Sequence, residues 1–158
     1  MPTLPEAECR RRLAEARHLV LATVHPDRGV DVVPVVAAAE GSTVWVPVDT
    51  VKAKSTARLR RIANVARDPR VSLLAEHYDD DWTQLWWVRA HGTAHEAGPA
   101  ELERARAALG RRYRDYEDPA VIVGALVVAL DRWTGWSAAP SCARVTRCAA
   151  RPTAVRQR

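Results

Sequence analysis

The sequence contains no phenylalanine, one methionine and only seven glycines among its 158 residues. These few glycines form neither the Gly-x-Gly-x-x-Gly pattern nor the P-loop that holds nucleotide phosphates, and no Gly-x-Ser-x-Gly elbow of a hydrolase is present. The three cysteines, Cys9, Cys142 and Cys148, are an odd set without metal-type spacing, which does not suit a disulfide framework. The common nucleotide-binding and hydrolase signatures are therefore absent, and a disulfide scaffold is not expected.

Long apolar segments are also lacking. The longest apolar run, residues 121–130, has ten residues and is interrupted by Gly124, which is too short to span a bilayer. The chain is charged from Glu6 to Arg12, so we expect no secretory signal. With 47% hydrophobic residues the chain is not disordered overall. We expect a soluble, cytoplasmic protein with no membrane partner.

Acidic residues are absent from residues 139–158, which carry five arginines. These arginines account for the whole net charge of +5, because residues 1–138 hold nineteen basic and nineteen acidic groups. We predict one domain at 1–138 and a basic, mobile C-terminal tail at 139–158. A high pI that reports a tail is weak evidence for nucleic-acid binding, so we do not expect a nucleic-acid partner.

Lysine is equally scarce, since Lys52 and Lys54 are the only two among 24 basic residues. They lie two apart where a predicted strand runs into a predicted helix, and such residues share one face of an extended segment. Ser55 or Thr56 can cap that helix, whose free N–H groups and dipole favour an anion. Lysine suits phosphate as a compact charge with three donors. The spacing alone fits a phosphate site and a solvated strand end equally well.

Hydrophobic alternation and turn residues predict a mainly β chain with inserted helices. Strands are expected at 17–25, 30–39, 43–48, 70–77, 82–96 and 125–137. Helices are expected from a capping box formed by Thr3 and Glu6 to about Ala16, at 55–67 and after Gly98. Tight turns join the first three strands into an antiparallel meander. Six strands with inserted helices favour a closed or nearly closed barrel.

The helix predicted at 55–67 has an apolar face and a basic face. The apolar positions at helical spacing are Leu59, Ile62, Ala63 and Ala66. The opposite face carries Arg58, Arg60, Arg61 and Arg67. These arginines fit contacts with phosphate backbones or a solvated helix face, and no aromatic residues interleave with them as a nucleic-acid platform requires.

Tryptophan replaces phenylalanine as the bulky aromatic residue, with six in the chain. Trp86 and Trp87 are adjacent on a predicted strand and must therefore point to opposite faces. One can enter the core while the other covers an outer surface. The outer indole is a candidate for a subunit interface, for contact with a cofactor ring or for packing against a helix.

No metal site is expected. His91 and His95 lie on a predicted strand, where residues four apart are roughly 13 Å from each other and cannot share one zinc. The acidic run 79–81 is better explained as a hairpin tip than as a cation site.

Together these residues resemble the pyridoxamine 5'-phosphate oxidase-like split β-barrels, which bind flavin mononucleotide (FMN) or the deazaflavin coenzyme F420. Three stretches carry the resemblance, at 21–35, 48–74 and 77–89, and the last is similar to a deazaflavin-dependent subgroup. The resemblance covers about residues 4–137. It implies a six-stranded antiparallel FMN-binding split β-barrel, and a homodimer that holds two cofactors in grooves between its subunits.

The resemblance also implies a set of cofactor-binding residues. The second strand would lie beside the cofactor ring, and the loop after the third strand would hold the phosphate, with a further contribution from the partner subunit. These residues are Val32, Val33, Pro34 and Val35; Val48, Thr50, Lys52, Lys54 and Ser55; and Trp86, Trp87 or Arg89 from the partner. The Lys-x-Lys pattern, with Val46 and Val48 before it, departs from the adjacent arginine and lysine of the FMN oxidases. This departure argues against tight FMN binding and against vitamin B6 oxidase activity.

The leading hypothesis is an F420-dependent oxidoreductase that moves hydride between the reduced coenzyme and an unidentified small molecule. The candidates for a proton donor are Tyr78, His77 and Arg89, which the sequence does not rank. One alternative is an FMN-dependent oxidase or reductase of the same fold. Another is a non-enzymatic module that binds a cofactor, haem or nucleic acid.

Overall fold

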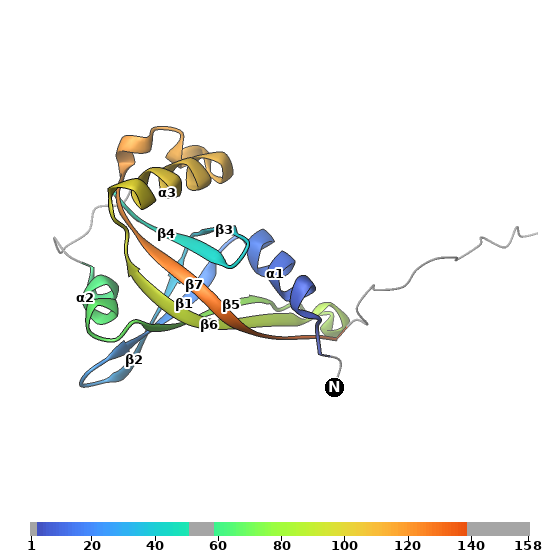
Figure 1. The fold of residues 1–158 in the computed structure, drawn as a ribbon. Helices are drawn as coiled ribbons and strands as arrows, with labels where there is room; N and C mark the ends of the chain where they lie inside the picture. The colour runs from blue at the N-terminus through green and yellow to red at the C-terminus, as the bar shows by residue number, and fades with distance from the viewer. Residues whose placement is uncertain (1–2, 51–58, 139–158) are drawn as a thin grey trace, which may run out of the picture.

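The computed structural model describes residues 3–50 and 59–138, which form one strongly curved antiparallel sheet with helices around it (Figure 1). The strands are β1 (Leu19–His25), β2 (Gly29–Val35), β3 (Ala38–Glu40), β4 (Thr43–Asp49), β5 (Arg70–His77), β6 (Trp86–Glu96) and β7 (Ile122–Ser137). The helices are α1 (Glu6–Glu15), α2 (Arg60–Arg67) and α3 (Pro99–Arg112), with short 3-10 turns η1 (Trp82–Gln84), η2 (Arg114–Tyr116) and η3 (Pro119–Val121).

The strand order is β2-β1-β5-β6-β7-β4-β3, so the two edge strands are neighbours in the chain. Only Val36 and Ala37 separate the end of β2 from the start of β3. The sheet must therefore curl until its two edges meet within two residues. This is the mainly β, antiparallel split barrel that the sequence predicted.

The single strand expected at 30–39 is wrong, and the described residues contain seven strands instead of six. Its first half, β2, pairs with β1 from Val35↔Leu19 to Gly29↔His25. Its second half, β3, pairs with β4. The segment changes partners at Val36–Ala37 because it crosses from one edge of the curled sheet to the other.

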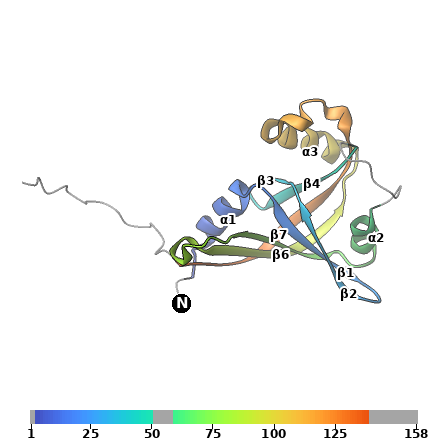
Figure 2. The same cartoon turned by 180° about the vertical axis from the view of Figure 1, so that it is seen from behind.

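Alternate residues of the central strands fill the barrel interior. Leu21, Leu73 and Val88 are fully buried there, while their neighbours along each strand face outward. Helix α1 adds Cys9 and Leu13 to this core. A second cluster lies beneath α3, which both views place over β3 and β4 (Figures 1 and 2). The core therefore fixes α1 and α3 on different parts of the sheet.

Two details of the predicted helices are wrong. Helix α1 starts after Pro5 without a side-chain cap, because Thr3 is in a β-bridge with Trp136 and cannot form a capping box. On α2, Ala63 and Ala66 are exposed, and Asn64 and Val65 are buried beside Ile62. The buried face includes Asn64 because its amide donates hydrogen bonds to Thr23 (2.9 Å) and Asp31 (2.9 Å) of the β1–β2 hairpin.

Strand β6 begins four residues later than predicted, since Trp82–Gln84 forms the turn η1. Strand β7 ends at Ser137, which pairs with Trp86, and the predicted tail lies outside the described residues. Among the helices of the described part, none combines the length and the apolar character that crossing a bilayer requires.

Gly92 is predicted to be essential for folding. It lies at the register shift between β6 and β7, where a Cβ atom would stand 1.9 Å from the carbonyl oxygen of Ala129. The clashing atoms belong to the backbone, which cannot move aside as the end of a flexible side chain can. Gly92→Ala should therefore lower the free energy of unfolding, measured in urea, by about 2–4 kcal/mol. In Gly124→Ala the added Cβ makes only ordinary contact with Val48 at 3.6 Å, and this control should change stability by under about 1 kcal/mol. An equal loss of unfolding free energy in Gly92→Ala and Gly124→Ala would contradict the tight packing at Gly92.

Candidate active site

A partly enclosed pocket lies where the sheet changes edges. It has a volume of about 360 Å³ and is bounded by the ends of β2 and β4, by α2 and by the segment 113–116. Pro34, Val35, Val36 and Pro47 give it an apolar wall. Four acidic or basic side chains and two tyrosines complete the lining: His18, Asp49, Arg61 and Asp115, with Tyr113 and Tyr116. An apolar pocket with a few polar groups is the usual form of a small-molecule site.

Arg61 is the principal cation of this pocket. Its Nη2 donates to the carbonyl oxygen of Pro47 at 3.0 Å, while its Nε is buried and has no hydrogen-bond partner among the described residues. Burial lowers the pKa of the guanidinium, and the neighbouring charge of Asp49 acts in the opposite direction. A guanidinium remains protonated even when burial lowers its pKa, so Arg61 gives the pocket a partly desolvated positive charge. Its Nε–H is a hydrogen-bond donor that is still unpaired among the described residues.

Asp49 stands opposite Arg61 at the end of β4. The pairing of β4 with β7 shifts register between Val48 and Asp49, and such a bulge changes the direction of the side chain. The Tyr116 hydroxyl donates to Asp49 Oδ2 at 2.9 Å. Burial and this carboxylate raise the pKa of Tyr116 well above its usual value, so the phenol stays protonated. Tyr116 is thus a neutral wall of the pocket.

The structure brings some of the predicted site residues to this pocket. Pro34 and Val35 line it. Val48 lies between Pro47 and Asp49, which also line it, and packs partly against the core. The backbone N–H of Thr50 donates to Val121 at 3.0 Å, which fixes the end of β4 to η3. Lys52, Lys54 and Ser55 lie outside the described residues.

Other predicted residues lie on the outer face of the sheet. Val32, Trp87 and Arg89 line a separate depression of about 330 Å³ over β1, β2, β5 and β6. The Arg89 guanidinium lies 5.7 Å from the centre of the Trp87 ring. Val32 is 63% exposed. Within one subunit this group is separate from the pocket at Arg61.

Trp86 and Val33 point the other way. Trp86 packs against the core, with the Arg12 guanidinium 5.1 Å from its ring and His77 stacked at 6.4 Å. Val33 also packs against the core. Adjacent Trp86 and Trp87 therefore serve an inner and an outer environment, as strand alternation requires.

Sequence reasoning missed Arg61, Asp49, Tyr113 and Tyr116 as pocket residues. For Arg61 a signal existed, because it shares a helix face with Asn64 and Val65 at spacings of three and four. The apolar face predicted for this helix was displaced by one residue from the face that is buried. The prediction therefore put Arg61 on the solvent-exposed face. The tyrosines approach from the far end of α3, which no local pattern reveals.

The histidines and the acidic tip have local partners. His91 is hydrogen-bonded to Ser72 at 2.7 Å, and His95 to Glu101 at 2.9 Å. In the turn at 79–81, Asp81 accepts from Thr83 and Asp79 accepts from Asp81. The described residues contain no group of three or more histidine, cysteine or acidic side chains placed to hold a metal.

Solved structures share this fold. A conserved hypothetical protein from Mycobacterium tuberculosis is 24% identical, with a TM-score of 0.69 over 85% of this chain and 86% of that one. A FAD-binding protein from Mesorhizobium loti is 18% identical, with a TM-score of 0.63 over 84% of this chain and 94% of that one. The haem storage protein HutZ from Vibrio cholerae is 16% identical, with a TM-score of 0.58 over 80% and 89%.

None of the curated proteins compared with the sequence matches it. The family model described as pyridoxamine 5'-phosphate oxidase matches residues 5–137, which is most of the chain and nearly all of the described structure. The match includes the strands that form the pocket and the helix that supplies Arg61. The chain therefore belongs to the pyridoxamine 5'-phosphate oxidase family.

Proposed function

We propose that the protein is an oxidoreductase that binds the deazaflavin coenzyme F420 in the Arg61 pocket and moves hydride between it and a small molecule. The observation that carries the proposal is Arg61 itself, a partly buried cation with a spare N–H in an otherwise apolar pocket. Such a group matches a phosphate next to a planar ring. The coenzyme, when bound, supplies the redox chemistry.

The protein's own residues have defined tasks in this proposal. Pro34 and Val35 offer an apolar surface to the ring and exclude water from one side of it. Arg61 attracts the phosphate, and Lys52, Lys54 and Ser55 add donors from the segment that joins β4 to α2. Tyr116 keeps its proton and holds Asp49 in place by their hydrogen bond. The substrate takes its proton from solvent or from a side chain that the partner supplies.

Two other ligands are alternatives for the same pocket. FMN has the same combination of planar ring and phosphate, and a structurally similar protein is described as FAD-binding. Haem is the second, since HutZ shares the fold. Fluorescence titration with coenzyme F420 and with FMN, together with absorbance titration with haemin, decides among them. Tightest binding of coenzyme F420 supports the proposal, and tightest binding of FMN or haemin overturns it.

The phosphate site is tested with Lys52→Ala, Lys54→Ala and Arg61→Gln. A charge-assisted hydrogen bond is worth about 1.5–3 kcal/mol, so each change should weaken coenzyme binding about ten- to hundredfold. Added salt should weaken wild-type binding more than binding by the variants, because part of the attraction is screened. Titration of coenzyme fluorescence at two salt concentrations measures both effects.

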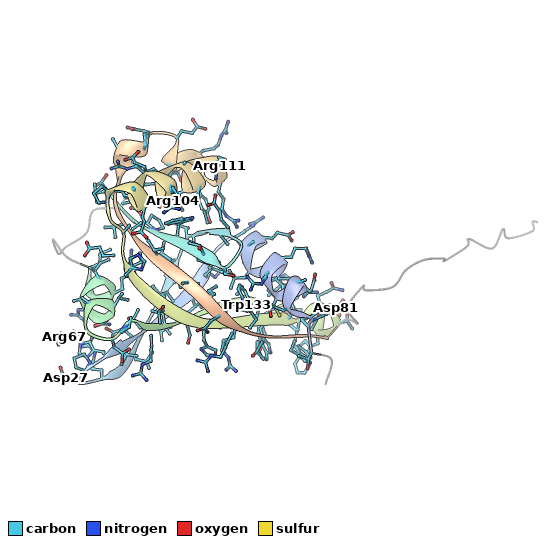
Figure 3. The ribbon with its side chains drawn as sticks, in the orientation of Figure 1. Asp27, Arg67, Asp81, Arg104, Arg111 and Trp133 are labelled. Atoms are coloured by element: carbon cyan, nitrogen blue, oxygen red, sulfur yellow. The ribbon has the colours of Figure 1, made fainter. Side chains whose placement is uncertain are left out.

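Arg67→Ala is the matched control, because Arg67 is an exposed arginine on the last turn of the same helix, α2, as Figure 3 shows. It removes the same charge as Arg61→Gln and should change affinity less than twofold. The phosphate site lies elsewhere if Arg67→Ala and Arg61→Gln weaken binding equally. Wild-type affinity in both lysine variants would remove Lys52 and Lys54 from the site.

We also propose a homodimer built on the outer face of β2, β1, β5 and β6. This face carries apolar side chains at Val20, Val32, Leu74 and Trp87, and Val32 is 63% exposed. A continuous apolar sheet face of this kind usually marks an interface. A two-fold dimer would cover it with a copy of itself and would bring Trp87 and Arg89 toward the partner's pocket.

Val32→Asp should convert the dimer to a monomer in sedimentation experiments at micromolar concentration, because it places a charge in an apolar interface. Val123→Asp is the control, since Val123 is 55% exposed on β7 and does not line the outer-face depression. This control should stay dimeric. A monomeric wild type, or a dimer that survives Val32→Asp, would show that the outer face is not the interface.

A further inference from the structure

Asn64 is the only asparagine among the 158 residues, and it is buried on α2 with 4% of its surface exposed. Its amide nitrogen donates to the Thr23 hydroxyl at 2.9 Å and to Asp31 Oδ2 at 2.9 Å. A carboxylate only accepts hydrogen bonds, so the amide must turn its nitrogen toward Asp31. The two N–H groups of one amide therefore reach two strands, β1 and β2.

The pairing of β1 with β2 explains how one side chain reaches both acceptors. Thr23 and Asp31 are directly opposite each other in the ladder, so their side chains stand next to each other on one face of the sheet. Leu21 and Val33 are the preceding pair on that face, and both pack in the core of the barrel. Thr23 and Asp31 thus continue the inward-facing row, and Asn64 covers its end from α2.

The Asp31 carboxylate has a second partner. Arg28 Nη2 donates to its two oxygens at 2.9 and 3.0 Å. The Asn64 amide, and after it Arg28, lowers the pKa of Asp31, so this carboxylate is ionised at neutral pH. A hydrogen bond to an ionised acceptor is stronger than one between neutral groups. The hairpin therefore holds the Asn64 amide firmly.

Asn64 lies one helical turn from Arg61, on the same face of α2. The hairpin strand that carries Asp31, β2, also carries Pro34, and both Arg61 and Pro34 line the pocket. Figures 1 and 2 both place α2 beside the β1–β2 hairpin. The Asn64 hydrogen bonds therefore join the two elements that bring the cation and the apolar wall to the pocket.

The apolar anchors of α2 are few. This helix has eight residues, and its buried apolar side chains are Ile62 and Val65. Apolar packing is non-directional, so these two side chains keep α2 on the barrel but do not fix its rotation about its own axis. Hydrogen bonds require a short distance and a nearly straight angle. The two bonds of Asn64 therefore fix the rotation of α2, and that rotation decides where Arg61 points.

We propose that Asn64 is a positioning residue of the candidate active site. By joining α2 to Thr23 and Asp31, it holds Arg61 toward the pocket and so sets the affinity of the pocket for an anion. Asn64 itself does not line the pocket. This role rests on the proposed function for the identity of the ligand, and it adds a residue that acts through Arg61.

The first test needs no ligand. In protein that contains isotope-labelled arginine, the magnetic resonance signal of the Arg61 Nε–H is the one that disappears in Arg61→Gln. Because this Nε is buried, its hydrogen should exchange with water more slowly than that of the exposed Arg67. Asn64→Leu keeps nearly the same shape without the amide. It should speed the exchange at Arg61 about tenfold, because α2 can then turn and expose the group.

Three further variants separate positioning from stability. Thr23→Val removes one acceptor and should also speed the exchange at Arg61, while Thr23→Ser keeps the hydroxyl and should preserve slow exchange. Ala63→Leu is the matched control on α2, since Ala63 is exposed and its side chain makes no hydrogen bond. The backbone N–H groups of Ile62 and Asp68, which donate to Leu59 and Asn64, should keep their exchange rates in every variant.

The second test is a double-mutant cycle on coenzyme affinity. Asn64→Leu should weaken binding of coenzyme F420 about three- to tenfold in the otherwise wild-type protein, because Arg61 no longer faces the phosphate. In the Arg61→Gln background the same change should weaken binding less than about twofold, because the residue through which Asn64 acts is missing. A general loss of structure would weaken binding equally in both backgrounds. Thermal unfolding confirms that each variant is folded.

Three outcomes overturn the inference: unchanged exchange at Arg61 in Asn64→Leu, faster exchange at Ile62 and Asp68 in that variant, or an equal loss of coenzyme affinity in the two backgrounds. A protein that binds coenzyme F420 and keeps slow exchange at Arg61 in every variant overturns the inference and leaves the proposed function intact. A protein that does not bind the coenzyme overturns the proposed function, while the exchange rates still decide the role of Asn64.

Discussion

The crossing of the chain from one edge of the sheet to the other at Val36–Ala37 is the constraint on which the rest of the molecule depends. An exposed sheet edge leaves backbone donors and acceptors without partners and invites association with other chains. Here the chain leaves one edge strand and enters the other within two residues. Tyr113 reinforces the junction, because its hydroxyl donates to the Ala37 carbonyl and accepts from the Ala37 N–H at 3.4 Å. The pocket is formed at this junction, since Pro34, Val35 and Val36 belong to it.

Charge burial separates Arg61 from the other arginines. On α1, Arg11 contacts Glu8 and Glu15 at 2.7 and 2.5 Å, yet such exposed pairs contribute at most about 1 kcal/mol each. Moving a cation out of water costs several kcal/mol, and for Arg61 the Pro47 carbonyl oxygen and the neighbouring charge of Asp49 offset part of this cost. Arg61 is held in that position by a helix whose Asn64 is fastened to the β1–β2 hairpin. Charges placed at such a cost are concentrated at functional sites.

Local patterns of the sequence predict the strands well and their partners poorly. Alternation and turns located β1, β4 and β5 to within two residues, and the family resemblance named Pro34 and Val35, which line the pocket. Alternation does not show that 30–39 divides between two partners, since both halves remain extended. Alternation also does not show that Asn64 is buried. A polar side chain is buried where hydrogen-bond partners are available, and here Thr23 and Asp31 accept from the Asn64 amide. Both features depend on pairing between residues distant in sequence.

Strand β6 carries an inner and an outer set of side chains, and each set has a different environment. Its period of two sends Val88 and Ala90 into the core and leaves Trp87 and Arg89 outside. A shift of one residue would exchange these sets, placing a guanidinium in the barrel and exposing the core. The buried residues therefore fix the register, and the register fixes which side chains lie on the outer face. If the proposed dimer forms on this face, the contribution of β6 to its partner's pocket follows from the packing of its own interior.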